Sequence, residues 1–187
     1  MRIGIVVGSV REGRVGGGIA QWVHEQAAER DAEYVRIDLK AFELPVYDAA
    51  AIPAFVRDGA YEDPRVAAFA QEIAACDGFV FVTPEYNHGV PGALKNAFDS
   101  IFTEWWGKAI AFVSYGAALG FRVVEQWRVI VANTNMFDVK AQVAISTILH
   151  LHDGVLVPSE RHPDELRMLF DSLEAATAAM QVMRART

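Results

Sequence analysis

A loop with the composition of a flat-ligand site follows the most apolar short segment of the chain. Residues 78–82 form a continuous run rich in β-branched and aromatic side chains, which predicts a strand buried on both faces. Directly after it come Pro84, Glu85, Tyr86 and Asn87, and then a stretch rich in glycine and proline. Such a loop is stiff, has free backbone N–H and C=O groups and carries one aromatic face, so it is suited to a planar polar heterocycle. Ligands of open α/β sheets bind at the carboxyl ends of the strands, and this junction is therefore a predicted binding site.

A second candidate site lies between the first predicted strand and the first predicted helix. Residues 8–18 contain Ser9, the two arginines Arg11 and Arg14, and five glycines. Unpaired N–H groups at a helix N-terminus point toward an anion, and glycines let the backbone come close to it. The segment therefore predicts a phosphate site, although it matches neither the P-loop ending Gly-Lys-Ser/Thr nor the G-x-G-x-x-G dinucleotide pattern. A flexible connection with solvated arginines is the alternative interpretation.

An alternation of strands and helices positions these two loops. The pattern predicts strands at residues 3–7, 34–39, 78–82, 109–114 and 139–145. It predicts helices at residues 15–30, 65–76, 91–102 and 119–131, and a last one that begins near Pro163 and ends near Arg186. Such an alternation indicates an α/β fold in which a five-stranded parallel sheet lies between two layers of helices. Residues 1–187 are expected to form one domain, with a long connection at residues 41–63.

Composition and charge exclude several classes of function. The chain of 187 residues carries a formal net charge of −7 and has no basic stripe, which argues against a nucleic-acid partner and favours a small molecule. The single cysteine, Cys76, lies among apolar residues and is expected to be a small buried side chain. No signal-peptide pattern and no apolar stretch of about 20 residues is present, so we expect a cytoplasmic protein without a membrane partner.

Three histidines and one aromatic cluster invite other interpretations. The histidines lie close together in the sequence beside Asp153, but their spacing matches no zinc motif, so we expect no metal and a solvated or capping role for His150, His152 and His162. His88 lies within the ring-binding loop and is interpreted as a turn residue beside Gly89.

The aromatic cluster follows the helix at residues 91–102, and we interpret it as part of a subunit interface formed by Phe102, Trp105 and Trp106.

Three segments at strand ends together resemble the NADPH-dependent FMN reductase family. They are Gly8-Ser9-x-Arg11, Pro84-Glu85-Tyr86-Asn87 and Ser114-Tyr115-Gly116, and the similarity covers almost the whole chain. The resemblance implies a flavodoxin-like fold that binds FMN. It implies that the FMN phosphate contacts Ser9, Arg11 and the backbone at Val15 and Gly16. It also implies that the isoalloxazine ring contacts Pro84, Glu85, Tyr86 and Asn87, with further backbone contacts from Ser114 and Gly116.

The same resemblance implies an oxidoreductase in which FMN carries the chemistry and no catalytic side chain is required. NADPH or NADH would be the co-substrate, and a quinone, an azo dye, a metal oxyanion or free flavin would be the small-molecule electron acceptor. Arg14 and Arg122 are candidates for contact with the ribose 2′-phosphate of NADPH. Homodimers or homotetramers with flavin sites near the subunit boundaries are also implied. The alternative is a flavin-binding electron carrier or redox sensor that acts on a protein partner.

Two loops depart from the pattern of this family. Arg14, Val15 and Gly16 stand where many relatives have a serine, an apolar residue and an asparagine, so contacts from Val15 and Gly16 are expected to come from the backbone alone. The loop at residues 116–122 has single glycines where relatives have pairs. A domain that binds no FMN is a third interpretation, which rests only on these altered glycines.

Overall fold

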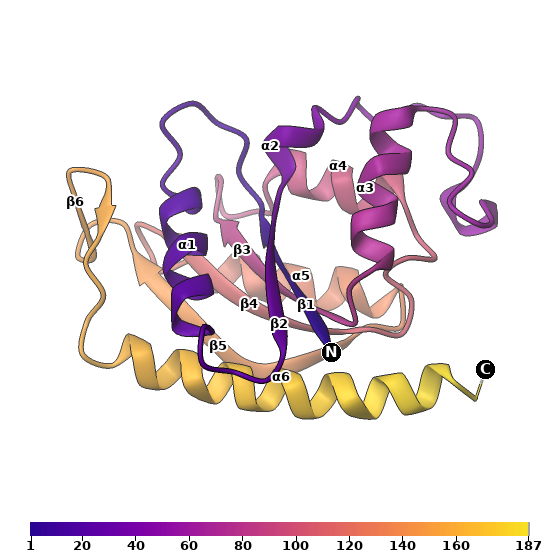
Figure 1. Ribbon diagram of the computed structural model, residues 1–187. Coiled ribbons are helices and arrows are strands. Elements are labelled where there is room, and N and C mark those ends of the chain that lie inside the picture. The colour runs from indigo at the N-terminus through magenta and orange to yellow at the C-terminus, as the bar shows by residue number, and fades with distance from the viewer. Residues whose placement is uncertain (187) are drawn as a thin grey trace.

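A five-stranded parallel sheet forms the centre of the computed structural model, which describes residues 1–186 (Figure 1). The strands lie in the order β2-β1-β3-β4-β5, and each neighbouring pair is parallel. In chain order they are β1 (Arg2–Val7), β2 (Glu33–Asp38), β3 (Gly78–Pro84), β4 (Ala109–Gly116) and β5 (Phe137–Ser146). This architecture confirms the predicted fold class, because helices cover both faces of the sheet.

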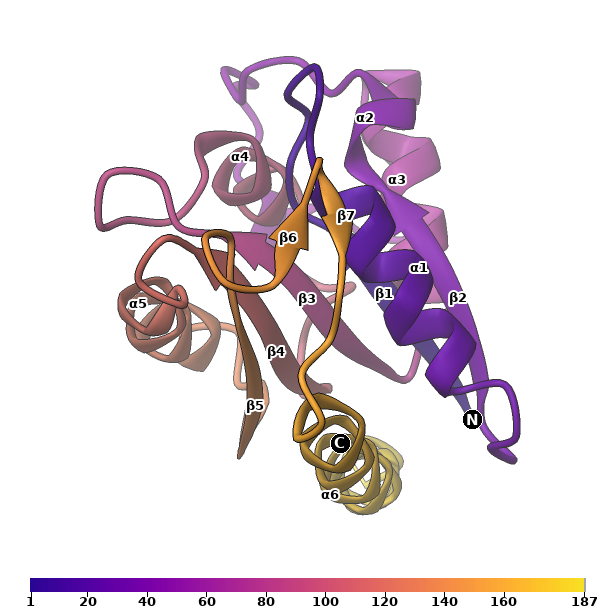
Figure 2. The ribbon, with the colours of Figure 1, turned by 90° about the vertical axis from the view of Figure 1, so that its left-hand side faces the viewer.

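Each face of the sheet has its own hydrophobic core. One face packs against α1 and α6, and the other packs against α2, α3, α4 and α5. Figure 2 shows α5 and α6 on opposite sides of β4 and β5. The bounds of the helices are Gly16–Gln26 for α1, Leu39–Phe42 for α2, Pro64–Ala74 for α3, Gly92–Ser100 for α4, Phe121–Ala132 for α5 and His162–Arg184 for α6.

The third strand is two residues longer than the sequence predicts. Thr83 and Pro84 continue β3 because they pair in register with Ser114 and Tyr115 of β4. Beyond the pairing, the backbone N–H of Glu85 donates to the carbonyl of Tyr115 at 3.0 Å. The predicted ring-binding loop is therefore hydrogen-bonded to the end of the neighbouring strand.

Several predicted helices are shorter than expected, among them those at residues 15–30 and 119–131. The first begins at Gly16 and ends at Gln26, and residues 27–30 form turns in place of the predicted helical continuation. The helix predicted at residues 119–131, α5, begins at Phe121 rather than at Leu119, because Leu119 and Gly120 both have positive φ, at 67° and 72°. A positive φ is incompatible with a right-handed helix.

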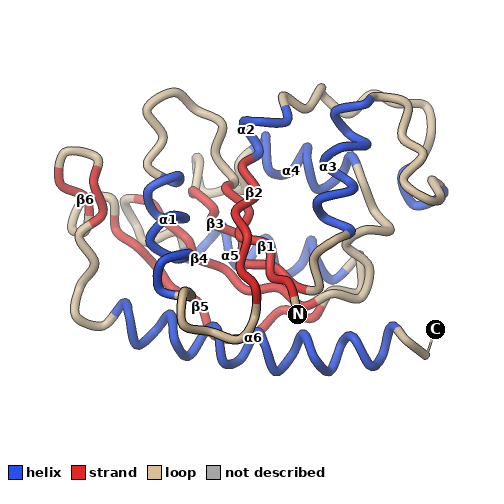
Figure 3. The backbone as a smooth tube through the Cα atoms, in the orientation of Figure 1, coloured by secondary structure: helices blue, strands red, loops and turns tan. Residues whose placement is uncertain are grey.

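The long connection at residues 43–63 is held against α4. The side chain of Asn96 accepts a hydrogen bond from the backbone N–H of Tyr47 at 2.8 Å and donates one to the carbonyl of Pro45 at 2.7 Å. The connection contains a short 3₁₀ helix, Pro53–Phe55, and otherwise appears as tan loop between α2 and α3 in Figure 3. It ends at Asp63, whose carboxylate caps α3 by accepting from the N–H of Arg65 at 2.8 Å.

The prediction of a subunit interface is wrong for Trp105. Its side chain is fully buried within one chain, with its ring centroid 4.9 Å from that of Phe79 and 5.3 Å from that of Phe98. The turns at residues 103–107 return the chain from α4 to β4 and so insert Trp105 into the core. Trp106 is 45% exposed and is the member of the pair that faces outward.

Three further features complete the fold. A hairpin of β6 (Leu151–His152) and β7 (Val155–Leu156), which was not predicted, lies beyond the end of β5 at the left of Figure 1. Cys76 is buried, as predicted, and burial raises the pKa of its thiol to about 11. Among the helices of residues 1–186, none combines the length and apolar character that crossing a bilayer requires.

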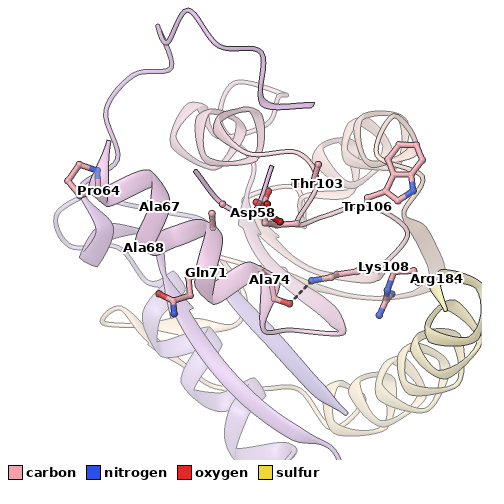
Figure 4. A pocket seen from close by; sticks show the side chains of 13 residues that line it. Asp58, Pro64, Ala67, Ala68, Gln71, Ala74, Thr103, Trp106, Lys108 and Arg184 are labelled. Atoms are coloured by element: carbon pink, nitrogen blue, oxygen red, sulfur yellow. Dashed lines mark hydrogen bonds between the residues drawn. The ribbon is translucent and has the colours of Figure 1, made fainter. Parts of the chain in front are cut away.

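A large cavity of about 850 Å³ lies between α3 and the turns that precede β4 (Figure 4). The buried side chain of Lys108 reaches its wall and donates to the carbonyls of Ile73 and Ala74, at 2.8 and 3.2 Å. These carbonyls end α3, so the ammonium group caps that helix, where a positive charge is favoured. The ammonium also lies 5.5 Å from the centroid of the Phe79 ring. Burial nevertheless lowers the pKa of Lys108 to about 8.

Lys108 should make the stability of the protein rise between about pH 8 and pH 10.5. In this window the unfolded chain keeps a proton that the folded chain has lost, so raising the pH favours the folded state by at most about 1.4 kcal/mol per pH unit. Urea unfolding of the wild type and of Lys108→Met across this range measures the effect, because the difference between the two removes the titration of all other groups. The exposed Lys140→Met serves as the control and should show no such difference. A difference between wild type and Lys108→Met that stays constant from pH 7 to 10.5 contradicts the assignment.

Candidate functional site

A cavity of about 350 Å³ lies at the carboxyl ends of β1, β3 and β4. Its volume falls in the range of small-molecule sites, roughly 300–1,000 Å³. The first loop lines it with Ser9, Arg11 and Val15, which follow β1. Parallel strands bring their carboxyl ends to one edge of a sheet, and the cavity therefore forms where the sequence places its two candidate loops.

The segments after β3 and β4 form the other walls of this cavity. Pro84, Glu85 and Tyr86 line it from the loop after β3, and Gly116 lines it from the end of β4. Of the ten predicted binding residues, seven thus share one cavity. An eighth, Gly16, is the first residue of α1 and directly adjoins the cavity residue Tyr115.

Two of the predicted residues do not line the cavity. Asn87 is exposed and has a φ of 49°, which places it in the tight turn that follows Tyr86. That turn is closed by two hydrogen bonds between the backbones of Tyr86 and Gly89, and His88 within it also has a positive φ, of 67°. Ser114 is fully buried, and its hydroxyl donates to the carbonyl of Leu119 at 2.8 Å.

Arg14 holds the first loop in place. Its guanidinium group forms a bidentate pair with Asp38 at the end of β2, with N–O distances of 2.6 and 2.5 Å, and it also donates to the carbonyl of Ser9 at 2.6 Å. Lys40 forms a second ion pair with Glu12 of the same loop. The alternative of solvated arginines is therefore wrong for Arg14, whose side chain is 17% exposed and is already engaged by a carboxylate.

A hydrogen bond between two hydroxyl groups joins the first loop to the ring-binding loop. The hydroxyl oxygens of Ser9 and Tyr86 are 2.8 Å apart, and Ser9 is 1% exposed. The guanidinium carbon of Arg11 lies 5.9 Å from the centroid of the Tyr86 ring, a distance at which a cation interacts with an aromatic face. Tyr86 therefore contacts both parts of the predicted site.

Glu85 is a buried carboxylate at the same cavity, and it forms an ion pair with an exposed arginine. Arg122, at the start of α5, donates from Nε to Oε1 of Glu85 at 2.7 Å. The side chain of Glu85 is only 6% exposed, and within residues 1–186 its second oxygen, Oε2, has no hydrogen-bond partner. A buried carboxylate oxygen without a donor is an available acceptor for a ligand.

Sequence reasoning missed several cavity residues that a strand-end argument could have found. Tyr115 stands inside the quoted Ser-Tyr-Gly segment, and its side chain lines the cavity. Thr147 follows β5, and Leu151 begins the β6–β7 hairpin beyond it. Because β5 is parallel to β4, its end also reaches this edge of the sheet, which is the signal that could have indicated them.

The histidines form a structural pair. The ring centroids of His150 and His162 are 4.5 Å apart, and each Nδ1 accepts a backbone N–H, from Ser146 at 3.0 Å and from Ser159 at 3.1 Å. The two imidazoles therefore bind turn backbone and do not cap a helix, since α6 has no side-chain cap, and a solvated role is wrong for His162, which is 3% exposed. Burial lowers the pKa of His162. Across the described residues no group of three or more potential metal ligands comes together.

Comparison with known proteins finds relatives along most of the chain. A model of the family described as NADPH-dependent FMN reductase matches residues 1–150. An NAD(P)H-dependent FMN reductase of Saccharomyces cerevisiae is 33% identical over 186 residues, which cover 93% of this chain and 97% of that protein. Another, from Nectria sp, is 38% identical over 136 residues, covering 67% of this chain and 64% of that protein. The match therefore spans slightly less than two thirds of the length of the Nectria protein.

Solved structures show the same fold at low sequence identity. The flavoenzyme NAD(P)H:(acceptor) oxidoreductase FerB from Paracoccus denitrificans superposes with a TM-score of 0.69. The alignment covers 96% of this chain and 97% of that one at 19% identity. At this level of identity the likeness establishes the flavodoxin-like arrangement of the sheet and helices.

Proposed function

Because the chain belongs to the NADPH-dependent FMN reductase family, we propose that it is an FMN-containing oxidoreductase that uses NADPH or NADH to reduce a small acceptor. One observation carries the proposal. The loop with two arginines at the N-terminus of α1 and the Pro84–Tyr86 loop line a single cavity, although 68 or more residues separate them in sequence.

The residues of the first loop fit the phosphate end of FMN. The first-turn N–H groups of α1 are free of the usual helical acceptors, and the N-cap residue Val15 has no side-chain group that could bond them. No acidic residue lies in that turn, so the helix dipole is not neutralised. Arg11 and the hydroxyl of Ser9 add further donors beside it. We assign the phosphate to Ser9, Arg11 and the backbone at Val15 and Gly16.

The residues of the second loop fit the flat end of FMN. Pro84 and Tyr86 offer apolar and aromatic surface, and the orphaned Oε2 of Glu85 offers an acceptor for a ring N–H. Gly116 adds a stretch of backbone without a side chain. When bound, FMN would supply the hydride-transfer chemistry, so the chain needs to bind and orient it rather than to provide a catalytic acid or base. We assign the ring to Pro84, Glu85, Tyr86 and Gly116, with Asn87 and Ser114 acting through the geometry of the turns they hold.

The decisive experiment is a flavin spectrum followed by anaerobic reduction. The purified protein, reconstituted with FMN, should bind it and lose its oxidised flavin absorbance when NADPH or NADH is added, and should then recover it when a quinone is added. Binding without bleaching by either nucleotide would contradict the reductase and favour a flavin-binding electron carrier. Absence of flavin binding would reject the assignment of the cavity.

Replacing Arg11 by alanine tests the phosphate end. The change should weaken FMN binding by about 1.5–3 kcal/mol, the value of a hydrogen bond to a charged group, and should weaken riboflavin much less because riboflavin has no phosphate. Titration of each flavin by fluorescence gives both dissociation constants. The matched control is Arg36→Ala, since Arg36 is an exposed arginine on β2 away from the cavity. Equal losses for FMN and riboflavin would argue that Arg11 shapes the loop and does not contact phosphate.

We further propose a homodimer or homotetramer in which the β6–β7 hairpin lies at a subunit boundary. The segment around the hairpin exposes four large apolar side chains, with fractions of 51–71%, beside the cavity residue Leu151: Ile148, Leu149, Val155 and Val157. Grouped exposed apolar residues of this kind mark interaction surfaces. Light scattering should give a mass above that of one chain, and Leu149→Asp should lower it while Val129→Asp, exposed on α5, should not. A wild-type monomer at all concentrations would refute this proposal.

A further inference from the structure

We propose that Tyr115 is a phosphate-binding residue of the flavin site, where its hydroxyl donates a hydrogen bond to the phosphate at the N-terminus of α1. This inference rests on the proposed function and deepens it, because neither the sequence motifs nor the comparisons assign a role to this side chain. It adds to the site a donor that comes from the sheet rather than from the first loop.

The hydroxyl of Tyr115 is buried and lacks a hydrogen bond of good geometry. Tyr115 is 5% exposed, and in the described part of the chain the nearby hydroxyl of Ser9 is the one weak partner of its hydroxyl oxygen. The neighbouring hydroxyl of Ser9 forms its hydrogen bond with Tyr86 instead. Buried polar groups are nearly always paired, so a poorly paired hydroxyl at a cavity wall indicates a group that a ligand completes. Burial also raises the pKa of Tyr115, so the phenol remains a donor throughout the neutral range.

Gly16 fixes where this hydroxyl lies. A Cβ atom built at Gly16 would collide with the hydroxyl oxygen of Tyr115, so the phenol rests against the first residue of α1. The space that any side chain at this position would fill is occupied by the tyrosine hydroxyl. The hydroxyl thus lies beside the free N–H groups of the first helical turn, where an anion is favoured.

The groups around the hydroxyl of Tyr115 match the phosphate of FMN better than its ring. The groups that converge here are donors: the first-turn N–H groups of α1, the guanidinium group of Arg11 and the hydroxyl of Tyr115. Arg14 is already paired with Asp38, and so its charge is largely balanced. A site made of donors matches a group that only accepts, and a phosphate presents several such oxygens.

Tyr115→Phe tests the proposal because it removes the hydroxyl and keeps the ring. The dissociation constant for FMN should rise about tenfold or more, as for the loss of one hydrogen bond to a charged group, while that for riboflavin should change less than about twofold. An unchanged FMN constant overturns the proposal. Equal weakening of FMN and riboflavin also overturns it, since that outcome assigns the side chain to the general shape of the cavity.

The stability of the flavin-free protein gives a second readout. Removing a poorly paired buried hydroxyl should leave the urea midpoint of Tyr115→Phe unchanged or higher than that of the wild type. The matched control is Tyr34→Phe, because the hydroxyl of Tyr34 is paired with Oε1 of Glu174 at 2.8 Å. That control should lower the midpoint and leave the ratio of FMN to riboflavin binding unchanged. A midpoint that falls as far in Tyr115→Phe as in Tyr34→Phe overturns the proposal.

Inorganic phosphate separates failure of this inference from failure of the proposed function. If the wild type binds no flavin, the reductase assignment fails, but phosphate alone should still raise the urea midpoint of the wild type, and should raise that of Tyr115→Phe less. That result would support the hydroxyl as an anion ligand without a flavin. Equal stabilisation of both proteins by phosphate, or of neither, would reject Tyr115 as a phosphate ligand.

Discussion

The parallel register of β1, β3 and β4 is the constraint on which the site depends. Val7 aligns with Val82, and Thr83 and Pro84 align with Ser114 and Tyr115, so the three strands end at one edge of the sheet. A shift of one residue in either pairing would turn the side chains after it to the opposite face. Register therefore decides whether the three loops can contact one ligand at all.

Charge pairs hold the first loop against this edge. β1 and β2 are aligned so that Asp38 lies opposite Val7, the last residue before the loop. That position brings the Asp38 carboxylate to Arg14, and Arg14 in turn binds the carbonyl of Ser9. Ordering a loop rich in glycine costs much conformational entropy, and the ion pair offsets part of that cost. The ion pair gives the loop a defined shape while leaving Arg11 at the cavity.

The sequence predicted the fold and the location of the site better than it predicted the contacts within them. Hydrophobic periodicity located all five parallel strands, and the strand-end rule located the cavity, because both depend on local patterns. The partner of Arg14 could not be predicted, since Asp38 reaches it only through the pairing of β1 with β2. Trp105 was assigned to a surface for a similar reason: local composition does not reveal the turn that buries it. The hairpin of β6 and β7 has strands of two residues, too short to produce a period.

The hydroxyl pair of Ser9 and Tyr86 has a consequence for substitutions in either loop. A hydrogen bond of 2.8 Å joins the two loops, so the loss of one hydroxyl also removes the partner of the other. A change at Ser9 would therefore alter the restraint on the Tyr86 ring, 77 positions away in the sequence, and the effects of substitutions at the two residues should not be additive.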